Sequence, residues 1–215
     1  CGYSGMRSLD IAYDIENRYG DSPEYIYSSA YFNTRPEKFF KFFKSEVLDV
    51  KIEPSETFFA LAELEKQEKL QTIISKNCFS LSERAGCKNV YNIYGTIYEN
   101  ICSHCGKEYP IEFMKQASSV PLCEKCGHIV RPKVKLFGEM LDHDIITKVA
   151  DEVAKADVLL LLGTTLESYT YKNYIKYFRG NSIIVIHQNP HYSDARTNLV
   201  FLDRPKNVLP KLLED

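Results

Sequence analysis

Two features are missing from this sequence of 215 residues: a long hydrophobic run and an excess of charge of one sign. The longest apolar stretch, Val158 to Leu162, is far shorter than the roughly 20 residues that a membrane-spanning helix needs. The formal net charge of −2 provides no basic surface for nucleic acid or anionic lipid. We therefore expect a globular protein that binds neither a membrane nor nucleic acid.

The N-terminus also lacks two features. It has no signal peptide, so we expect a cytoplasmic protein. It has no initial methionine, since the sequence begins with Cys1 in a glycine-containing turn. We therefore expect further residues upstream, including a strand. Hydrophobic residues make up 44% and charged residues 26% of the chain, which suits one large domain with a smaller insert.

Helices and strands alternate along much of the chain. In the first half, periodicity predicts helices over 23–27, 36–48 and 55–69, with Ser55 as N-cap of the last, and strands over 70–75 and 89–94. In the second half it predicts helices over 142–156, 169–178 and 205–213 and strands over 157–163, 182–187 and 199–202. The run 157–163 is apolar almost throughout, as expected of a parallel strand buried on both faces. This alternation indicates an α/β fold with a doubly wound parallel sheet.

Four of the seven cysteines form two Cys-x-x-Cys pairs separated by seventeen residues: Cys102, Cys105, Cys123 and Cys126. In a cytosolic chain, paired cysteines at this spacing indicate zinc, whose tetrahedral geometry four thiolates complete. No position is left for a catalytic water, so the zinc is expected to be structural. His104 and His128 lie in the same segment and are expected to be surface residues rather than ligands.

Ligands of open α/β sheets bind beyond the carboxyl ends of the strands. This rule selects Gly2–Ser4, Asn77, Gly163–Leu166 and the turn after His187. The GTTL turn at Gly163–Leu166 follows a strand and precedes a helix, so its amide groups can contact a phosphate or a ribose. Many α/β proteins have such a turn, and alone it does not identify the ligand. His187 and His191 are expected to be solvated.

Several motifs in one order make the sequence resemble the sirtuins, the NAD-dependent protein deacylases. RPKVKLFGEML (131–141) is similar to the family's Arg-Pro-x-Val-x-x-Phe-Gly-Glu segment, and GTTLES (163–168) to its Gly-Thr-Ser-Leu. Residues 75–97 resemble the stretch from Thr-Gln-Asn-Ile-Asp to Leu-His-Gly, and CGYS (1–4) resembles the end of a Gly-Ala-Gly-x-Ser turn. The paired cysteines stand where sirtuins have a zinc ribbon.

The resemblance implies a Rossmann-like NAD-binding domain of residues 1–97 and 135–215, with a smaller lobe made of a zinc ribbon (98–134) and a helical segment (about 33–69). It implies that NAD or ADP-ribose contacts Gly2, Ser4, Lys76, Asn77, Phe79, Gly163, Thr164, Thr165 and Gln188. It also implies that an acylated lysine peptide or protein contacts Val134, Phe137, Gly138 and Glu139.

The sequence departs from the family at the positions that carry out the chemistry. In sirtuins the acyl-lysine oxygen attacks C1′ of the nicotinamide ribose, and a histidine acts as general base. Tyr94 stands at that histidine, and a phenol with its ordinary pKa near 10 is a poor base at neutral pH. Asn77 is retained as the second catalytic position. Phe79 replaces an aspartate that holds the nicotinamide amide, and Lys76 adds a positive charge that opposes nicotinamide departure.

These changes favour a degenerate sirtuin, that is, a pseudoenzyme that binds NAD or ADP-ribose and zinc with deacetylation weak or lost. The alternative is an active NAD-dependent protein-lysine deacylase or ADP-ribosyltransferase of the family that uses Tyr94 or a route without the histidine. A zinc-ribbon adaptor for nucleic acid is disfavoured by the acidic net charge.

Overall fold

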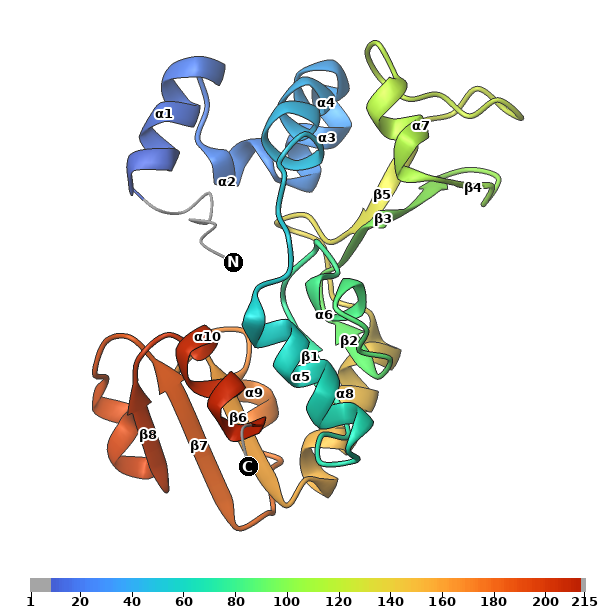
Figure 1. The fold of residues 1–215 in the computed structure, drawn as a ribbon. Coiled ribbons are helices and arrows are strands. Elements are labelled where there is room, and N and C mark those ends of the chain that lie inside the picture. The colour runs from blue at the N-terminus through green and yellow to red at the C-terminus, as the bar shows by residue number, and fades with distance from the viewer. Residues whose placement is uncertain (1–8, 214–215) are drawn as a thin grey trace. The chain divides into compact units, whose positions relative to one another are not determined.

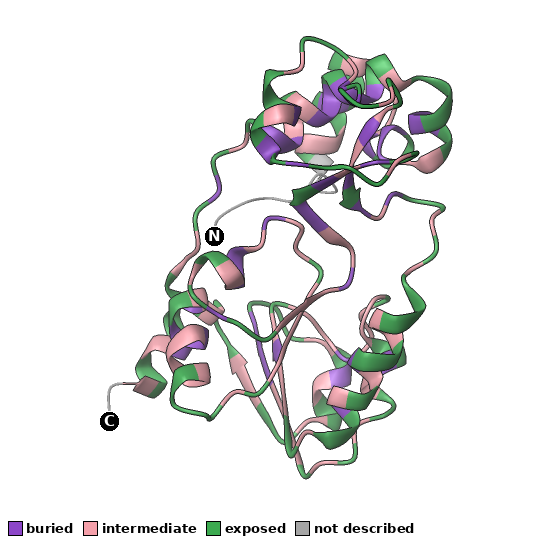
Figure 2. Cartoon of the chain, turned by 90° about the vertical axis from the view of Figure 1, so that its right-hand side faces the viewer, coloured by how far each residue is buried: buried purple, intermediate pink, exposed green. Residues whose placement is uncertain are grey.

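The structure is a computed structural model that describes residues 9–213; the predicted contacts of Gly2 and Ser4 lie outside this range. The chain forms two compact units, each assembled from several segments and each with its own buried residues (Figures 1 and 2). The first unit contains the chain up to Glu53, Asn77–Ser80 and Tyr94–Leu141. The second contains Pro54–Lys76, Leu81–Ile93 and the chain from Asp142 onward. Within 9–213, no helix combines the length and the apolar character needed to cross a membrane.

The domain boundaries expected from the sequence stay a prediction, and the compact units divide the chain at other places. Helix α5 (Glu56–Lys66), expected in the smaller lobe, belongs to the second unit. Residues from α1 (Leu9–Tyr19) to the π-helical turn η1 (Lys44–Leu48) join the cysteine-containing segment in the first unit.

The second unit is built on parallel strands. β6 (Val158–Leu162), β7 (Ser182–His187) and β8 (Leu199–Leu202) pair in that order, and β1 (Ile73–Ser75) pairs with β2 (Val90–Asn92). All of these pairs are parallel, so the prediction of an α/β fold with parallel strands is confirmed. β7 and β8 have the predicted bounds. β2 ends at Asn92, before the end of the predicted strand, and Gly95 begins the next strand.

Helices of the second unit surround these strands. They are α5, α6 (Leu81–Arg84), α8 (His143–Lys155), α9 (Lys172–Ile175), η2 (Tyr192–Arg196), α10 (Pro205–Val208) and η3 (Leu209–Leu213). Ala60 and Leu61 of α5 pack with Ile186 of β7 and Leu209 in one buried cluster. α8 begins at the predicted place because the Asp142 carboxylate accepts the N–H of Asp144 at 2.9 Å.

The first unit combines helices with an antiparallel sheet. Its helices are α1, α2 (Pro23–Ile26), α3 (Ser29–Thr34), α4 (Pro36–Phe43), η1 and α7 (Ile111–Gln116). Its strands β3 (Gly95–Cys102), β4 (Glu108–Tyr109) and β5 (Val130–Val134) pair in the order β4-β3-β5. The amphipathic helix predicted from Pro36 is confirmed: Phe39 and Phe43 are fully buried, with ring centroids 5.5 Å apart.

Two local expectations were wrong. β6 is not buried on both faces, since Val158 is 51% exposed and β6 pairs only with β7 among the described residues. The helix expected over 169–178 is only the four residues of α9, and Tyr169, at the start of the predicted range, is 87% exposed. Its N-cap, Tyr171, makes no side-chain capping bond, and aromatic residues have modest helix propensity. Ser55 occupies the N-cap of α5 but makes no capping bond.

Gly95 permits a close approach of two strands that no other residue allows. Its φ is +73°, and a Cβ there would collide with the carbonyl group of Lys133 on β5. We expect Gly95→Ala to lower the free energy of unfolding by about 2 kcal/mol or more, because strain and collision add. Urea unfolding followed by circular dichroism measures this loss.

Gly20 is the matched control. Its φ is +80°, but an added Cβ would meet nothing within 4 Å, so Gly20→Ala should cost only the backbone strain of about 1 kcal/mol. An equal loss of stability in the two variants would contradict a role for the close approach at Gly95.

Candidate functional site

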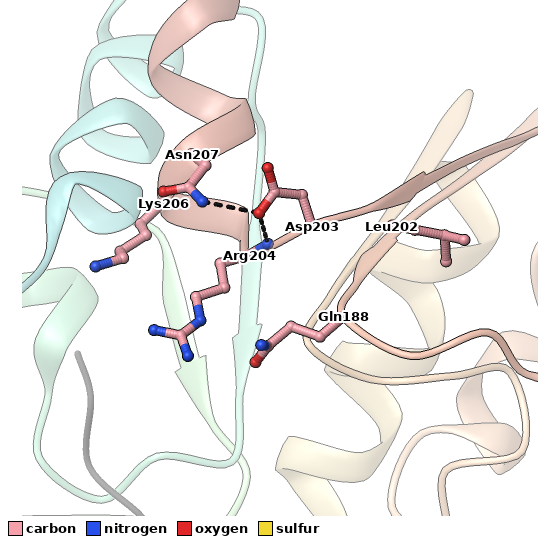
Figure 3. Close-up of a pocket in the computed structure, with 6 residues that line it drawn as sticks. All are labelled: Gln188, Leu202, Asp203, Arg204, Lys206 and Asn207. Atoms are coloured by element: carbon pink, nitrogen blue, oxygen red, sulfur yellow. Dashed lines mark hydrogen bonds between the residues drawn. The ribbon is translucent and has the colours of Figure 1, made fainter.

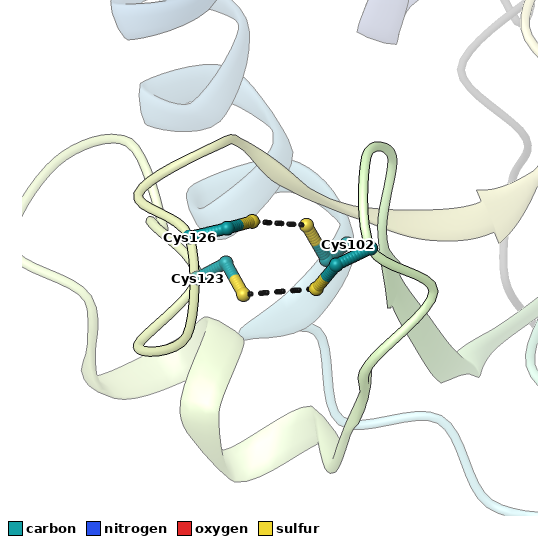
Figure 4. A group of neighbouring side chains, drawn as sticks. Cys102, Cys123 and Cys126 are labelled. Carbon is teal, nitrogen blue, oxygen red and sulfur yellow. Dashed lines mark hydrogen bonds between the residues drawn. The ribbon is translucent and has the colours of Figure 1, made fainter.

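The four paired cysteines meet in space, although they come from two separate loops (Figure 4). Their sulfur atoms all lie within 4.8 Å of one another; Cys102 and Cys126 are 3.4 Å apart, and Cys105 and Cys123 are 3.6 Å apart. Four ligands about 2.3 Å from a tetrahedral zinc ion lie about 3.8 Å from one another. The cluster therefore has the size and the chemistry of a zinc site.

The two loops have the same backbone form. The N–H of Gly106 donates to the carbonyl of Cys102 at 3.1 Å, and the N–H of Gly127 donates to that of Cys123 at 2.8 Å. Both glycines have positive φ, +70° and +74°, which a glycine adopts without strain. Each pair of thiols is thus held by a tight reversal of the chain.

The thiols have strongly divergent proton affinities. Burial would raise the pKa of Cys123, but the Tyr109 hydroxyl and the N–H of Lys125 outweigh it and lower that pKa to about 6. The N–H of His128 lowers the pKa of Cys126, yet the three neighbouring thiols raise it to about 12. Four thiolates repel one another, and a bound cation would remove that repulsion.

Two histidines near the cysteines are not ligands in this arrangement. His104 and His128 are exposed and stack on each other with ring centroids 4.0 Å apart. Neither belongs to the cluster of four thiols. Their predicted place on the surface is confirmed.

The predicted catalytic positions lie beside β3 in the first unit. Segment 77–80 is hydrogen-bonded to β3, where the N–H of Ile97 donates to the carbonyl of Cys78 at 3.0 Å. Asn77 Oδ1 accepts the N–H of Phe79 at 2.7 Å, which fixes the turn. Tyr94 directly precedes β3, is half-buried, and its carbonyl accepts the N–H of Lys135 at 2.9 Å. The structure therefore gathers Asn77, Phe79 and Tyr94 around one end of β3.

The segment predicted to contact the acylated lysine continues from β5. Val134 is buried, whereas Phe137 is 43% exposed. The Phe137 N–H donates to the Tyr27 carbonyl at 3.0 Å, and the Phe137 carbonyl accepts the N–H of Ser29 at 2.9 Å. Gly138, with φ of +89°, lies so close to Ser29 that an added Cβ would be 3.1 Å from its Oγ. One segment of the first unit, Tyr27–Ser29, thus holds Phe137 in place.

Glu139, predicted to bind substrate, already has protein partners. Arg131 donates to both of its carboxylate oxygens, at 2.7 and 3.0 Å, and the N–H of Leu136 donates to Oε2 at 2.9 Å. Burial opposes the charge, but the bonds from Arg131 and Leu136 outweigh it and hold the pKa of Glu139 below its ordinary value. The carboxylate closes the loop that presents Phe137, a role that its motif alone did not reveal.

The second unit has a pocket of about 360 Å³ at the carboxyl ends of β7 and β8 (Figure 3). Its lining residues are Gln188, Leu202, Asp203, Arg204, Lys206 and Asn207. Asp203 Oδ1 accepts the backbone N–H of Arg204 at 2.6 Å and the side-chain amide of Asn207 at 2.8 Å. Of these residues only Gln188 was predicted. The rule that selected the turns after β6 and β7 would have found Asp203 had it also been applied after β8.

The other predicted nucleotide contacts of this unit lie in loops. Gly163 follows β6 with φ of +64°, and its N–H donates to the carbonyl of Ile186 at 2.8 Å. Thr164 and Thr165 are half-buried, and Lys76 is exposed after β1. The sequence does not show that the turn after β6 is joined to strand β7 by a main-chain bond.

The expectation that His187 and His191 are solvated was wrong. His187 is only 6% exposed, and its Nε2 lies 3.0 Å from Asp194 Oδ2. The same oxygen accepts the N–H of His191 at 2.9 Å, and the His191 ring accepts the N–H of Ser193. Both histidines therefore shape the loop between β7 and β8, a pairing between distant side chains that no local pattern signals.

Comparison with known proteins agrees with these features. Residues 4–170 match the model of the Sir2 family. This chain belongs to the Sir2 family.

Two Sir2 relatives are similar over nearly the whole chain. An NAD-dependent protein deacetylase of Clostridium acetobutylicum is 35% identical over 97% of this chain and 85% of its own length. One of Clostridium perfringens is 36% identical over 99% of this chain and 88% of its own. The sequence resemblance to sirtuins is thereby confirmed.

Solved Sir2 structures share the fold. A His-to-Tyr mutant of Sir2 with a p53 peptide and NAD has a TM-score of 0.82 and 24% identity, covering 99% of this chain and 86% of that one. A structure described as the basis for the mechanism and regulation of Sir2 enzymes has a TM-score of 0.80 and 26% identity over the same shares. The fold class predicted from the sequence is confirmed.

The contacts of Glu139 predict a pH-dependent loss in Glu139→Gln. At pH 7 we expect Glu139→Gln to lower the free energy of unfolding by about 1–3 kcal/mol, because the charged hydrogen bonds to Arg131 weaken. Since the folded pKa is lowered from 4.5, this difference is complete above that value and disappears as pH falls through the folded pKa.

Urea unfolding of both proteins at several pH values measures this difference. The control is Glu16→Gln, on the exposed side of α1, which should leave stability nearly unchanged at every pH. If Glu139→Gln still lowers the free energy of unfolding by the same amount in strong acid, the ion pair between Glu139 and Arg131 is not the cause of the loss.

Proposed function

We propose that this Sir2-family chain binds NAD or ADP-ribose together with an acylated lysine peptide, and that its deacetylation is slow or absent. The observation that carries the proposal is the position of Tyr94. It lies between segment 77–80 and the Val134–Glu139 segment, at the position where the resemblance places the general base. Residues that could bind the ligands are present there, and Tyr94 replaces the histidine that removes the proton in sirtuins.

Nucleotide binding is supported by the loops of the second unit. The turn Gly163–Thr165 follows a parallel strand, at the kind of position where backbone N–H groups commonly bind phosphates and riboses. The pocket lined by Gln188, Arg204 and Asn207 offers amide and guanidinium donors at the same kind of strand end. These groups fit a ribose, a base edge and a phosphate, and they would hold the nucleotide without changing it.

Peptide binding is supported by the Phe137 loop. Sir2 structures have been solved with acetylated and with propionylated peptides. In this chain the loop follows strand β5 and is fixed by Arg131, Glu139 and the main chain of Ser29. An extended peptide could pair with such a rigid segment at little entropic cost.

The chemical step is where this chain differs from the sirtuin pattern. NAD supplies an electrophilic ribose carbon when it is bound, and the residues around it must position an acyl oxygen and accept a proton. Tyr94 stands where the family has a histidine, and a phenol hydroxyl is a weaker proton acceptor than an imidazole ring. Phe79 is 8% exposed and presents a ring where the family has a carboxylate. Lys76 is positively charged and would disfavour a developing cation.

The relatives favour a second candidate, an active NAD-dependent deacetylase. Both Clostridium proteins, at 35% and 36% identity, carry that name. In that case Tyr94 or another group would remove the proton.

Zinc belongs to the same proposal. Cys102, Cys105, Cys123 and Cys126 would complete its coordination, and no position would remain for a reacting water. Its role would then be to join the two loops that flank β3 and β5.

Nucleotide binding can be measured by calorimetric titration with NAD and with ADP-ribose. We expect a dissociation constant below about 1 mM for at least one of them. Gln188→Ala should weaken binding about fivefold, the effect of losing one hydrogen bond. Gln67→Ala, at an exposed glutamine at the end of α5, should leave it unchanged. The absence of heat with either nucleotide at millimolar concentration would disprove binding.

Deacetylation can be measured as nicotinamide release in the presence of an acetylated peptide. We expect almost no turnover by the natural sequence, and an increase of about 100-fold or more in the triple variant Tyr94→His, Phe79→Asp, Lys76→Gln, the usual contribution of a general base. Tyr94→His alone is the second variant, because an aspartate at buried position 79 can destabilise the fold.

Rapid turnover by the natural protein would favour the second candidate, and Tyr94→Phe then tests whether Tyr94 is the base. If the natural protein turns over rapidly and Tyr94→Phe abolishes turnover, Tyr94 is the base and the second candidate is correct. Rapid turnover that survives in Tyr94→Phe would show that another group supplies the base.

A further inference from the structure

Tyr109 is the aromatic residue in contact with the thiol cluster. It is the last residue of β4 and is 6% exposed, and its ring packs on Phe113 of α7 with centroids 4.3 Å apart. Its hydroxyl lies 3.1 Å from Cys123 Sγ. Tyr109 is outside both Cys-x-x-Cys pairs, so their spacing gives no indication of this contact.

The direction of this hydrogen bond follows from the second partner of the hydroxyl. The backbone N–H of Glu124 donates to the Tyr109 oxygen at 2.9 Å. A phenolic oxygen that accepts there keeps one proton to donate, and the sulfur of Cys123 is the acceptor within reach. Tyr109 is therefore oriented as a donor to a metal-binding thiolate.

The positively charged side chain of Lys107 lies over the ring of Tyr109. Lys107 Nζ is 4.8 Å from the ring centroid of Tyr109 and 2.7 Å from Glu124 Oε2. A cation over the face of a phenol makes its hydroxyl a better donor, because it withdraws electron density from the ring. Lys107, Tyr109 and Glu124 thus form one polar group beside Cys123.

We propose that Tyr109 is a positioning residue of the metal site, and that its hydroxyl strengthens zinc binding by donating to Cys123 Sγ. Four thiolates around one divalent cation leave an excess of two negative charges, which hydrogen-bond donors spread over the protein. The hydroxyl also fixes the sulfur in the direction that a tetrahedral ion requires. The proposal rests on the zinc assignment above and does not depend on nucleotide or peptide binding.

The test compares the full chain with Tyr109→Phe, which removes one oxygen and keeps the ring on Phe113. Zinc-loaded protein is titrated with a chromophoric chelator under reducing conditions. We expect zinc affinity to fall about tenfold or more in Tyr109→Phe, in the range usual for groups that support metal ligands. Tyr13→Phe, at a 70% exposed tyrosine of α1, is the matched control and should keep the natural affinity.

Cobalt substitution separates hydrogen bonding from packing. A thiolate that loses a donor becomes more electron-rich, so the sulfur-to-cobalt charge-transfer band should move to lower energy in Tyr109→Phe and stay fixed in Tyr13→Phe. Lys107→Met, which keeps the hydroxyl, should move the band in the same direction by a smaller amount. This second variant tests the proposal even if Tyr109→Phe folds poorly.

Natural affinity with an unshifted cobalt band in Tyr109→Phe would overturn the proposal. So would a loss of apo-protein stability with an unshifted band, since that describes packing alone. If the natural chain binds neither zinc nor cobalt, the metal assignment and the role of Tyr109 both fail. Calorimetry with NAD and ADP-ribose would still decide nucleotide binding separately.

Discussion

The antiparallel pairing of β3 with β5 is the constraint on which the first unit depends. Its register joins Gly95 to Val134 at one end and Cys102 to Val130 at the other. One end of β3 therefore presents Tyr94, and the other supplies the first metal-binding thiol. The close approach at Gly95 fixes this register, because only a glycine fits against the carbonyl of Lys133. A one-residue slip would turn every side chain to the opposite face of the sheet. The metal cluster and the altered catalytic position thus share one rigid element.

The first unit combines residues suited to binding with altered residues at the predicted catalytic positions. The thiols meet at distances that suit zinc, and the Phe137 loop is closed by a bidentate ion pair with Arg131. The scaffold for binding has thus kept its donors and acceptors. At the positions that the resemblance assigns to catalysis and nicotinamide binding, Tyr94 and Phe79 stand where sirtuins have a proton acceptor and a hydrogen-bond acceptor. A substitution by a side chain of similar volume costs the fold little, because the packing is preserved. The same substitution can slow the reaction strongly if it removes a general base.

Some of this could be predicted from residues close together in the sequence. Apolar runs indicated β7 and β8, Phe39 and Phe43 marked a buried helical face, and the cysteine spacing indicated the cluster. The helix α1 was missed, although Ile11, Ile15 and Tyr19 recur in it at helical spacing. Arg18 also holds it through Asp14 and Glu46. Glu46 is far along the chain, and periodicity does not report such a partner.

The sequence by itself predicted four metal-binding cysteines, the order of the motifs and, through the resemblance, a tyrosine at the family's histidine position. Covalent spacing and residue chemistry are sufficient for these conclusions. Only the tertiary structure decided that Glu139 pairs with Arg131, that His187 is buried against Asp194, and that Tyr109 donates to Cys123. The reason is physical: a side chain's partner depends on which strands and loops become neighbours, and that is fixed by packing of the folded chain rather than by distance along it.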